Sequence, residues 1–396
     1  MEKRNIAIFF GGCSSEYQVS LESAAAVMQH MDTERYRAIP VGISPQGGWY
    51  YFQGRTEQIR ADAWFNETDC VPAVLSPDPA VHGLLIFHKE GTEKLYIDAA
   101  FPVMHGRFGE DGTIQGLIEL AGIPLVGCGV LSSALCMDKD RAHRMARMAG
   151  IAVPQSLVLE RADRLPRMSE AAVPQSPVSE RTDRLEVGGG KAQKSGGSDG
   201  QAGECLLGDA QYTQLLEFCR RVGYPVFVKP VRAGSSYGIT KVTGEAQLRE
   251  AVVLAFQYDR QILVEETIEG FEVGCAVLGC DTLWTGEVDE IELSQGFFDY
   301  TEKYTLKTSA IHVPARIDAA VSQKIQETAK VLYRALDCSV FARVDLFLTP
   351  KGEIVFNEIN TIPGFTEHSR YPGMMKAAGM DFAELIDRMI GLAVMK

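Results

Sequence analysis

The stretch FARVDLFLTPKGEIVFNEIN, residues 341–360, decides the fold of the C-terminal part of the chain. Two runs rich in apolar and β-branched residues, Phe341 to Leu348 and Glu353 to Asn360, are separated by Pro350-Lys351-Gly352. Strand-forming residues on both sides of a short turn that contains glycine are typical of a β-hairpin. The stretch therefore predicts two antiparallel strands.

Three oxygen-bearing side chains share one face of this predicted hairpin. Glu358 and Asn360 are two positions apart, so they point to the same side of their strand, and Asp345 lies within a residue or two of directly opposite. Such donors suit Mg²⁺ held together with substrate phosphates. Carboxylates on a strand more often form a solvated edge, but strongly apolar residues surround these three. We therefore expect a magnesium site, with Arg343 on the same face.

A candidate phosphate-binding loop follows the predicted strand Tyr224 to Lys229. Lys229-Pro230 leads into a run of small residues that includes Gly234, Ser235 and Ser236. Small residues allow backbone N–H groups to surround a phosphate, and the lysine adds a point charge. The string Gly-x4-Gly-Lys-Ser/Thr of a P-loop is absent, and a Gly-Ser loop alone is usually a plain turn.

The exit of the predicted strand Ile262 to Glu266 is a candidate adenine site. Glu265, Glu266 and Ile268 lie at this exit, and Glu272 follows shortly afterwards. Adenine commonly binds at such a place through backbone groups, while an acidic side chain reaches the ribose. An ordinary exposed acidic turn explains the same spacing equally well, so both interpretations stay open at this point.

The N-terminal part alternates strand and helix patterns. Asn5 to Phe10, Ile39 to Ile43 and Ala99 to Met104 read as strands, and Ser20 is the expected N-cap of a helix after the first strand. This alternation predicts an α/β unit with a parallel sheet, whose site lies in loops at the carboxyl ends of the strands. Those loops contain Glu16 and His105; a lone histidine is more often structural than catalytic.

Residues 155–210 break the pattern. Ala152-Val153-Pro154-Gln155-Ser156 recurs 20 residues later, and Gly188 to Gly203 is rich in Gly, Ser, Lys and Gln. A single short duplication is too little for a solenoid, and the composition is that of a flexible linker. We expect a low-complexity surface insertion without chemistry of its own.

Composition excludes several classes of protein. The 396 residues include 39 Lys and Arg against 52 Asp and Glu, a net charge of −13, which argues against nucleic acid or an anionic membrane as the main partner. Nine dispersed cysteines without a Cys-x-x-Cys pair suggest cytosolic thiols. No stretch approaches a transmembrane span, and the short apolar run near the N-terminus reads as a strand. The expectation is a cytoplasmic protein.

Taken together and in order, the motifs resemble those of the D-alanine–D-alanine ligases of the ATP-grasp superfamily. The matching strings cover nearly the whole chain outside roughly 155–210, and such an ordered set is far more specific than any one member. They begin at Phe10-Gly11-Gly12, His105-Gly106, Met137-Asp138-Lys139, Lys229-Pro230, Phe298-Asp299-Tyr300, Ala342-Arg343 and Asn357-Glu358.

The resemblance implies roles for particular residues. ATP phosphates are expected on Lys139, Lys229 and Ser236, adenine on the segment Glu265, Glu266 and Ile268, and the ribose on Glu272. Two Mg²⁺ ions (Mn²⁺ is possible) are expected on Asp345, Glu358 and Asn360. Glu16, linked through Ser235 to Tyr304, is expected to fix the ammonium of the first D-amino acid, and His105 to lie near its carboxylate. Arg343 and the Gly364 amide would stabilise the tetrahedral intermediate.

The acceptor is expected to be D-serine. The strings around Phe298, Lys303 and Tyr304 and around Ser369 and Arg370 resemble those of vancomycin-resistance D-alanine–D-serine ligases. By the resemblance, Ser369 holds the carboxylate of the second substrate, and the cationic Arg370 can hydrogen-bond a serine hydroxyl. A housekeeping D-alanine–D-alanine ligase, a ligase for other carboxylates and amines, and an inactive nucleotide-binding regulator remain the alternatives.

The predicted architecture is mixed α/β and α+β, an ATP-grasp fold in three domains. Residues 1–130 form the N-terminal α/β domain for the first D-amino acid. Residues 131–154 and 211–270 form the central domain, interrupted by the insertion 155–210. Residues 271–396 form the C-terminal domain, which carries the Mg²⁺ site and a closing loop at 294–310; the central and C-terminal domains have antiparallel sheets. The family resemblance also implies a homodimer that acts in peptidoglycan synthesis.

Overall fold

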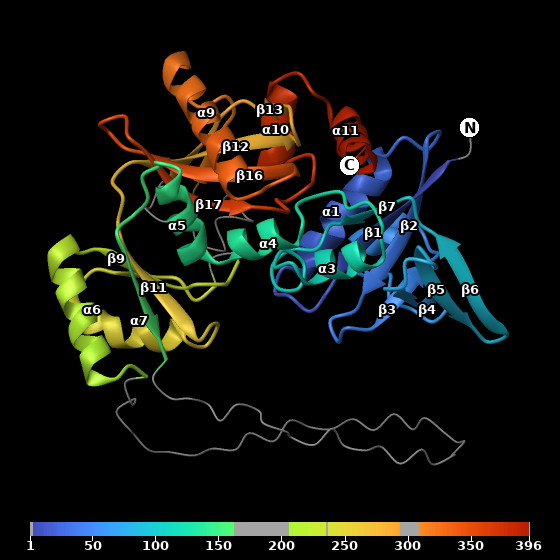
Figure 1. The fold of residues 1–396 in the computed structure, drawn as a ribbon, viewed down its shortest axis with the longest axis horizontal. Coiled ribbons are helices and arrows are strands. Elements are labelled where there is room, and N and C mark those ends of the chain that lie inside the picture. Colours follow the sequence, from blue (N-terminus) through green and yellow to red (C-terminus); the bar gives the residue numbers. More distant parts are fainter. Residues whose placement is uncertain (1–2, 162–205, 235–236, 294–308, 396) are drawn as a thin grey trace, which may run out of the picture.

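The computed structural model describes residues 3–161, 206–234, 237–293 and 309–395. Three sheets account for the architecture (Figure 1). A seven-stranded sheet is formed by the N-terminal part, a four-stranded sheet by the middle, and a six-stranded sheet by the C-terminal part. The mixed α/β and α+β architecture expected from the sequence is confirmed.

The N-terminal sheet has the strand order β6-β5-β4-β3-β2-β1-β7. Its strands are β1 (Arg4–Gly11), β2 (Tyr36–Ile43), β3 (Trp49–Phe52), β4 (Cys70–Leu75), β5 (Gly83–His88), β6 (Gly91–Tyr96) and β7 (Ala99–Pro102). The expected parallel unit consists of β2, β1 and β7. The other four strands extend it in antiparallel pairs, which makes the sheet mixed.

The first helix begins earlier than the sequence suggested. Helix α1 (Tyr17–His30) has Glu16 at its N-cap position, so the prediction of Ser20 as the cap was wrong. Ser20 is buried inside the helix, where its hydroxyl accepts from the Gly11 N–H and donates to the Val103 carbonyl. The hydroxyl therefore ties the helix to the carboxyl ends of β1 and β7, and it places Glu16 in the loop above them.

The middle of the chain forms an antiparallel sheet of order β10-β9-β11-β8. Its strands are β8 (Ser156–Glu160), β9 (Val226–Pro230), β10 (Thr240–Val242) and β11 (Gln261–Glu266), and helices α6 (Asp209–Val222) and α7 (Leu248–Ala255) flank them, with the short η1 (Glu245–Gln247) before α7. The expected start of the insertion at 155 was wrong, because residues 156–160 complete this sheet beside β11. Residues 162–205 of the expected insertion lie outside the described residues.

The C-terminal sheet runs β15-β14-β12-β16-β17, and β13 pairs with β12. Its strands are β12 (Phe271–Gly279), β13 (Leu283–Thr285), β14 (Asp289–Leu293), β15 (Ser309–His312), β16 (Val340–Leu348) and β17 (Ile354–Asn360). The predicted hairpin is β16 and β17, and its register pairs Asp345 with Glu358 and Arg343 with Asn360. Asn357 is an extra residue in β17, since the next pair is Leu346 with Phe356. This bulge lies beside the expected metal ligands.

Apolar residues cover both sides of the hairpin. Val344, Leu346 and Phe356 share a buried cluster with Ile325 and Leu332 of α9 (Ala319–Ala335). On the other side, Phe341 makes ring contacts with Phe101 of β7, Phe365 and Tyr371. The remaining helices within the described residues are α2 (Thr56–Arg60), α3 (Thr113–Leu120), α4 (Val130–Met137), α5 (Lys139–Met148), α10 (Arg370–Ala377) and α11 (Phe382–Val394).

These aromatic contacts join the N-terminal and C-terminal sheets through one core, and the loops of both parts meet above it. Within the residues described, none of the helices is long and apolar enough to cross a lipid bilayer. The eight described cysteines are free thiols.

Candidate active site

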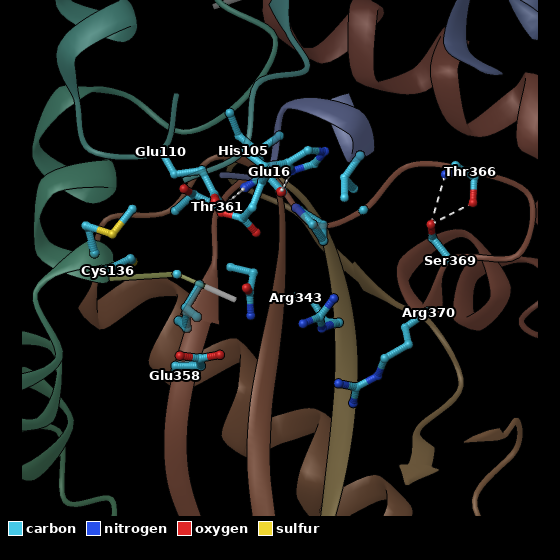
Figure 2. A pocket seen from close by; sticks show the side chains of 18 of the residues that line it. Glu16, His105, Glu110, Cys136, Arg343, Glu358, Thr361, Thr366, Ser369 and Arg370 are labelled. Atoms are coloured by element: carbon cyan, nitrogen blue, oxygen red, sulfur yellow. Dashed lines mark hydrogen bonds between the residues drawn. The ribbon is translucent and has the colours of Figure 1, made fainter. Parts of the chain in front are cut away.

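A cavity of about 360 Å³ lies where loops of the N-terminal part face the end of the β16–β17 hairpin. Figure 2 shows Glu16, His105 and Glu110 at one end of this pocket, with Arg343, Glu358 and Arg370 on the elements below them. Nine residues singled out from the sequence line the cavity: Glu16, His105, Lys139, Arg343, Glu358, Asn360, Gly364, Ser369 and Arg370. The structure thus brings together residues that are more than 300 positions apart in the chain.

Asp345 is the centre of a charged cluster on the floor of the site. Arg343 donates to both of its carboxylate oxygens, at 2.8 Å and 2.7 Å, and the Asn360 side chain donates to it at 2.8 Å. Asp345 is only 1% exposed. Burial alone would raise the pKa of Asp345, but Arg343 and Arg370 lower it below its usual value. The carboxylate therefore stays ionised and orients Arg343.

Arg370 begins helix α10 and is held by three acidic side chains. It donates to both carboxylate oxygens of Asp289, at 2.7 Å and 2.8 Å, and to Glu272 at 3.0 Å. Asp345 lies 3.3 Å from the same guanidinium. A guanidinium has five N–H donors, so these three hydrogen bonds leave capacity for a further acceptor. The expected contact of Glu272 with ribose would require its ion pair with Arg370 to rearrange.

Lys139 is the first residue of α5 and reaches into the cavity. Its ammonium donates to the Ala233 carbonyl at 2.9 Å and lies 3.5 Å from Glu358. Asp138 caps the helix by accepting from the Arg141 N–H, which fixes the backbone at the lysine. Lys139 therefore connects the loop after β9 with the face of β17 that carries Glu358.

Lys229 and Glu265 are not among the residues that line this cavity. Both side chains are buried, and the Lys229 ammonium is 2.5 Å from Glu265. Glu266, at the end of β11, is bonded instead to the backbone and side chain of Gln155. Ile268 is half-buried just beyond the strand. The adenine and phosphate assignments for this group remain predictions.

Glu16 is enclosed by two glycines. A Cβ atom at either Gly106 or Gly234 would overlap one of its carboxylate oxygens, so both positions leave room for the acid. His105 lies beside it, fully buried, with Nδ1 2.8 Å from the Ile362 carbonyl and Nε2 3.3 Å from the Ser23 hydroxyl. Burial lowers the pKa of His105. A neutral ring that donates from Nδ1 fits both partners.

Glu110 is a site residue that the sequence did not single out. Its carboxylate accepts from the Gly106 N–H at 2.7 Å and from the Ile362 N–H at 3.1 Å, so it joins the two loops that close one end of the cavity. Burial and the neighbouring Glu16 raise the pKa of Glu110 to about 8. Its position shortly after His105-Gly106, in the motif that begins there, was the available signal.

The loop after β17 supplies the remaining wall. The Ser369 hydroxyl accepts from the Thr366 N–H at 3.0 Å and lies 2.8 Å from the Thr366 hydroxyl (Figure 2). Gly364 faces this serine, because a Cβ there would be 3.2 Å from the Ser369 hydroxyl oxygen. Five expected site residues lie outside the described residues: Ser235, Ser236, Phe298, Lys303 and Tyr304. The same is true of residues 294–308 of the closing loop expected at 294–310.

The expected magnesium ligands form a set of hard oxygen donors on one face of the hairpin. Asp345 and Glu358 are paired across the strands, and Asn360 is beside them. Carboxylate and amide oxygens are donors that suit Mg²⁺ shared with phosphates. A carboxylate has about four lone-pair sites, and Asp345 already accepts two hydrogen bonds from Arg343 and one from Asn360, so one site is left for a metal. The donor chemistry therefore fits this ion.

Comparisons with known proteins agree with the geometry. A model of the D-ala D-ala ligase N-terminus matches residues 5–128, and one of the D-ala D-ala ligase C-terminus matches residues 208–391. The solved structure of the VanG D-Ala:D-Ser ligase from Enterococcus faecalis has 48% sequence identity and a TM-score of 0.81, over 99% of this chain and 100% of that one. Vancomycin B-type resistance protein VanB from Enterococcus faecalis is 42% identical over 100% of this chain and 99% of its own length. A putative D-alanine–D-lactate ligase from Streptomyces coelicolor is 41% identical, over 100% of this chain and 99% of its own.

The fold and the site define an ATP-dependent ligase that joins a carboxylate to an amine. The chain belongs to the D-alanine–D-alanine ligase family. The recognition made from the motifs, the ATP-grasp fold and the class of enzyme are thereby confirmed.

Proposed function

We propose that this enzyme joins D-alanine to D-serine in the cytoplasm, through D-alanyl phosphate, to make a peptidoglycan precursor associated with glycopeptide resistance. The observation that carries the proposal is the position of Arg370 in the cavity wall beside Ser369, with N–H capacity left after its bonds to Asp289 and Glu272. The 48% identity to a solved D-Ala:D-Ser ligase supports the same acceptor.

The first half of the reaction activates D-alanine. Glu16 holds the ammonium at the closed end of the cavity, and the carboxylate points toward Lys139 and Arg343. A carboxylate oxygen attacks the γ-phosphorus of ATP, and the bond from that phosphorus to the β-bridging oxygen breaks to release ADP. Lys139 and Lys229 offset the charge of the phosphates. Mg²⁺ on Asp345, Glu358 and Asn360 would supply further charge neutralisation when bound.

The second half forms the peptide bond. Ser369 binds the carboxylate of the acceptor, and Arg370 donates to its hydroxyl. The neutral amine of the acceptor attacks the acyl carbon, its nitrogen gives up one proton to solvent, and phosphate leaves with one oxygen of the original D-alanine carboxylate. The Arg343 guanidinium and the Gly364 N–H stabilise the negatively charged oxygen of the tetrahedral intermediate that forms between attack and departure of phosphate. A homodimer is proposed from the family resemblance alone.

The acceptor assignment is tested by competition. With ATP, Mg²⁺ and equal concentrations of D-alanine and D-serine, we expect mainly D-Ala–D-Ser, identified by mass spectrometry. The change Arg370→Met removes the hydroxyl donor, so it should shift the product ratio toward D-Ala–D-Ala about tenfold, the effect of one hydrogen bond of about 1.4 kcal/mol. Arg388→Met is the control, since Arg388 lies on α11 and pairs with Glu384.

Other outcomes would support the alternatives. D-Ala–D-Ala as the main product of the unaltered enzyme, or a ratio unchanged by Arg370→Met, would contradict the D-serine assignment. ATP binding without any dipeptide from any acceptor would favour an inactive nucleotide-binding regulator.

A further inference from the structure

His143 occupies a buried position that the proposed reaction does not use. It lies on α5, four residues after Lys139, and is 1% exposed. Its ring lies against Phe356 of β17, and its two nitrogens face different elements. One nitrogen faces β17, which holds the expected metal ligands Glu358 and Asn360. The other faces β11, which holds Glu265, the ion-pair partner of Lys229.

The Nε2 atom of His143 is 2.9 Å from the Asn357 carbonyl. A carbonyl only accepts, so Nε2 carries a hydrogen and donates. Asn357 is the extra residue of the bulge in β17, immediately before Glu358. The histidine therefore fixes the backbone at the bulge, and the bulge determines how Glu358 and Asn360 are placed opposite Asp345.

The Nδ1 atom of His143 faces a carboxylate oxygen of Glu265 at 3.5 Å. Among the described residues, both atoms are buried without a hydrogen-bond partner. Two acceptors that face each other in a buried place are unfavourable unless a proton lies between them. Burial lowers the pKa of His143, whereas Glu265 raises it, and the nearby Lys229 and Arg147 lower it.

The other oxygen of Glu265 is 2.5 Å from the Lys229 ammonium. Glu265 thus lies between the lysine and the imidazole, and it is 4% exposed. If the lysine turns toward a nucleotide phosphate, a buried carboxylate is left beside His143 alone. A buried charge without a partner is strongly destabilising. The His143 imidazole is in position to pair with Glu265 when Lys229 turns away.

We propose that His143 is a positioning residue for the nucleotide, because it shares Glu265 with Lys229 and fixes the Asn357 bulge before the metal-binding residues. When Lys229 engages a phosphate, Nδ1 of His143 takes up a proton from solvent and donates it to the Glu265 carboxylate. The same ring keeps β17 in the register that pairs Asp345 with Glu358. This inference rests on the nucleotide role proposed above for Lys229.

Two variants separate the contacts of His143. In His143→Gln the amide nitrogen can replace Nε2 and keep the bond to Asn357, while the contact with Glu265 is lost. In His143→Asn the amide nitrogen can replace Nδ1 and keep the contact with Glu265. His88→Gln is the control, because His88 is exposed at the end of β5. Affinity for ATP is measured by calorimetry without Mg²⁺ or amino acids, alongside the melting temperature.

His143→Gln is expected to weaken ATP binding about tenfold, and His143→Asn should weaken it less. With Mg²⁺ present, His143→Asn should instead raise the KM for ATP, since the bulge is released. The KM for D-alanine should stay within twofold in both variants. If both variants bind ATP within twofold of the unaltered protein, whatever their melting temperatures, the inference is overturned.

A double variant guards against a purely structural effect. If His143 acts through the lysine, adding His143→Gln to Lys229→Met should change ATP affinity by less than twofold; a further tenfold loss would contradict the shared network. Dipeptide formation by the unaltered enzyme is measured separately. If the unaltered enzyme ligates normally and the His143 variants keep its ATP affinity, only this inference is refuted. If the unaltered enzyme binds ATP without ligation, the proposed function is refuted.

Discussion

Replacement of Asp345 by asparagine is expected to lower turnover by about 10²–10³-fold, the loss typical for removal of one preorganised electrostatic group. Asp345 accepts two hydrogen bonds from Arg343 and one from Asn360, and it faces Arg370. Without its charge, two buried guanidinium groups compete for fewer anions, and Arg343 loses its orientation. The expected metal site also loses one of its two carboxylates. The measurement is ADP release with saturating ATP, Mg²⁺, D-alanine and D-serine.

The control for this variant is Asp281→Asn, at an exposed turn of the same sheet between β12 and β13. Circular dichroism should show that both variants fold. Asp345→Asn is also expected to melt at a lower temperature, because breaking a buried ion pair commonly costs about 3–5 kcal/mol. A folded Asp345→Asn enzyme with turnover within fivefold of the unaltered enzyme would contradict the role given to the cluster.

Removal of the Lys229 ammonium should have the second large effect. Lys229→Ala is expected to reduce kcat/KM for ATP by about 10²–10³-fold, since a fixed cation beside the phosphates is lost. The KM for D-alanine should change little, because Glu16 and His105 lie in the other part of the site. Initial rates at varied ATP and fixed amino acids give the comparison.

Stability must be separated from chemistry in this variant, because Lys229 also neutralises Glu265. The matched variant Lys229→Arg keeps a cation near Glu265 but changes its geometry, so its melting temperature should stay closer to that of the unaltered enzyme. The double variant Lys229→Ala with Glu265→Gln removes both charges and should recover stability without recovering turnover. Intact turnover of Lys229→Ala would refute the phosphate assignment.

The local pattern was enough to predict the C-terminal hairpin and its polar face. Alternation along β16 places Val344 and Leu346 on the side of α9, and it places Arg343 in the cavity wall with Asp345 bonded to it. The short turn sets the pairing of Leu346 with Phe356, and the bulge at Asn357 then makes Glu358 the partner of Asp345. Periodicity and turn length are local properties, so a single sequence contains them.

Contacts over long sequence distances could not be read in this way. Glu110 accepts a hydrogen bond from Ile362, 252 residues further along the chain, and Arg370 is paired with Asp289 across 81 residues. Ser20 looked like a helix cap because serine favours that position, but its hydroxyl joins two strands instead. The bulge at Asn357 and its bond to His143 likewise depend on packing between α5 and β17. Tertiary contacts decide these features.

The central claim, that ATP activates the carboxylate of D-alanine in this cavity, is tested most directly by following oxygen. D-alanine labelled with ¹⁸O in its carboxylate is incubated with the enzyme, Mg²⁺, ATP and unlabelled D-serine, and the released phosphate is analysed by mass spectrometry. The account predicts one ¹⁸O atom in each phosphate and one dipeptide for each ADP. Unlabelled phosphate, or ADP released without dipeptide, would contradict it.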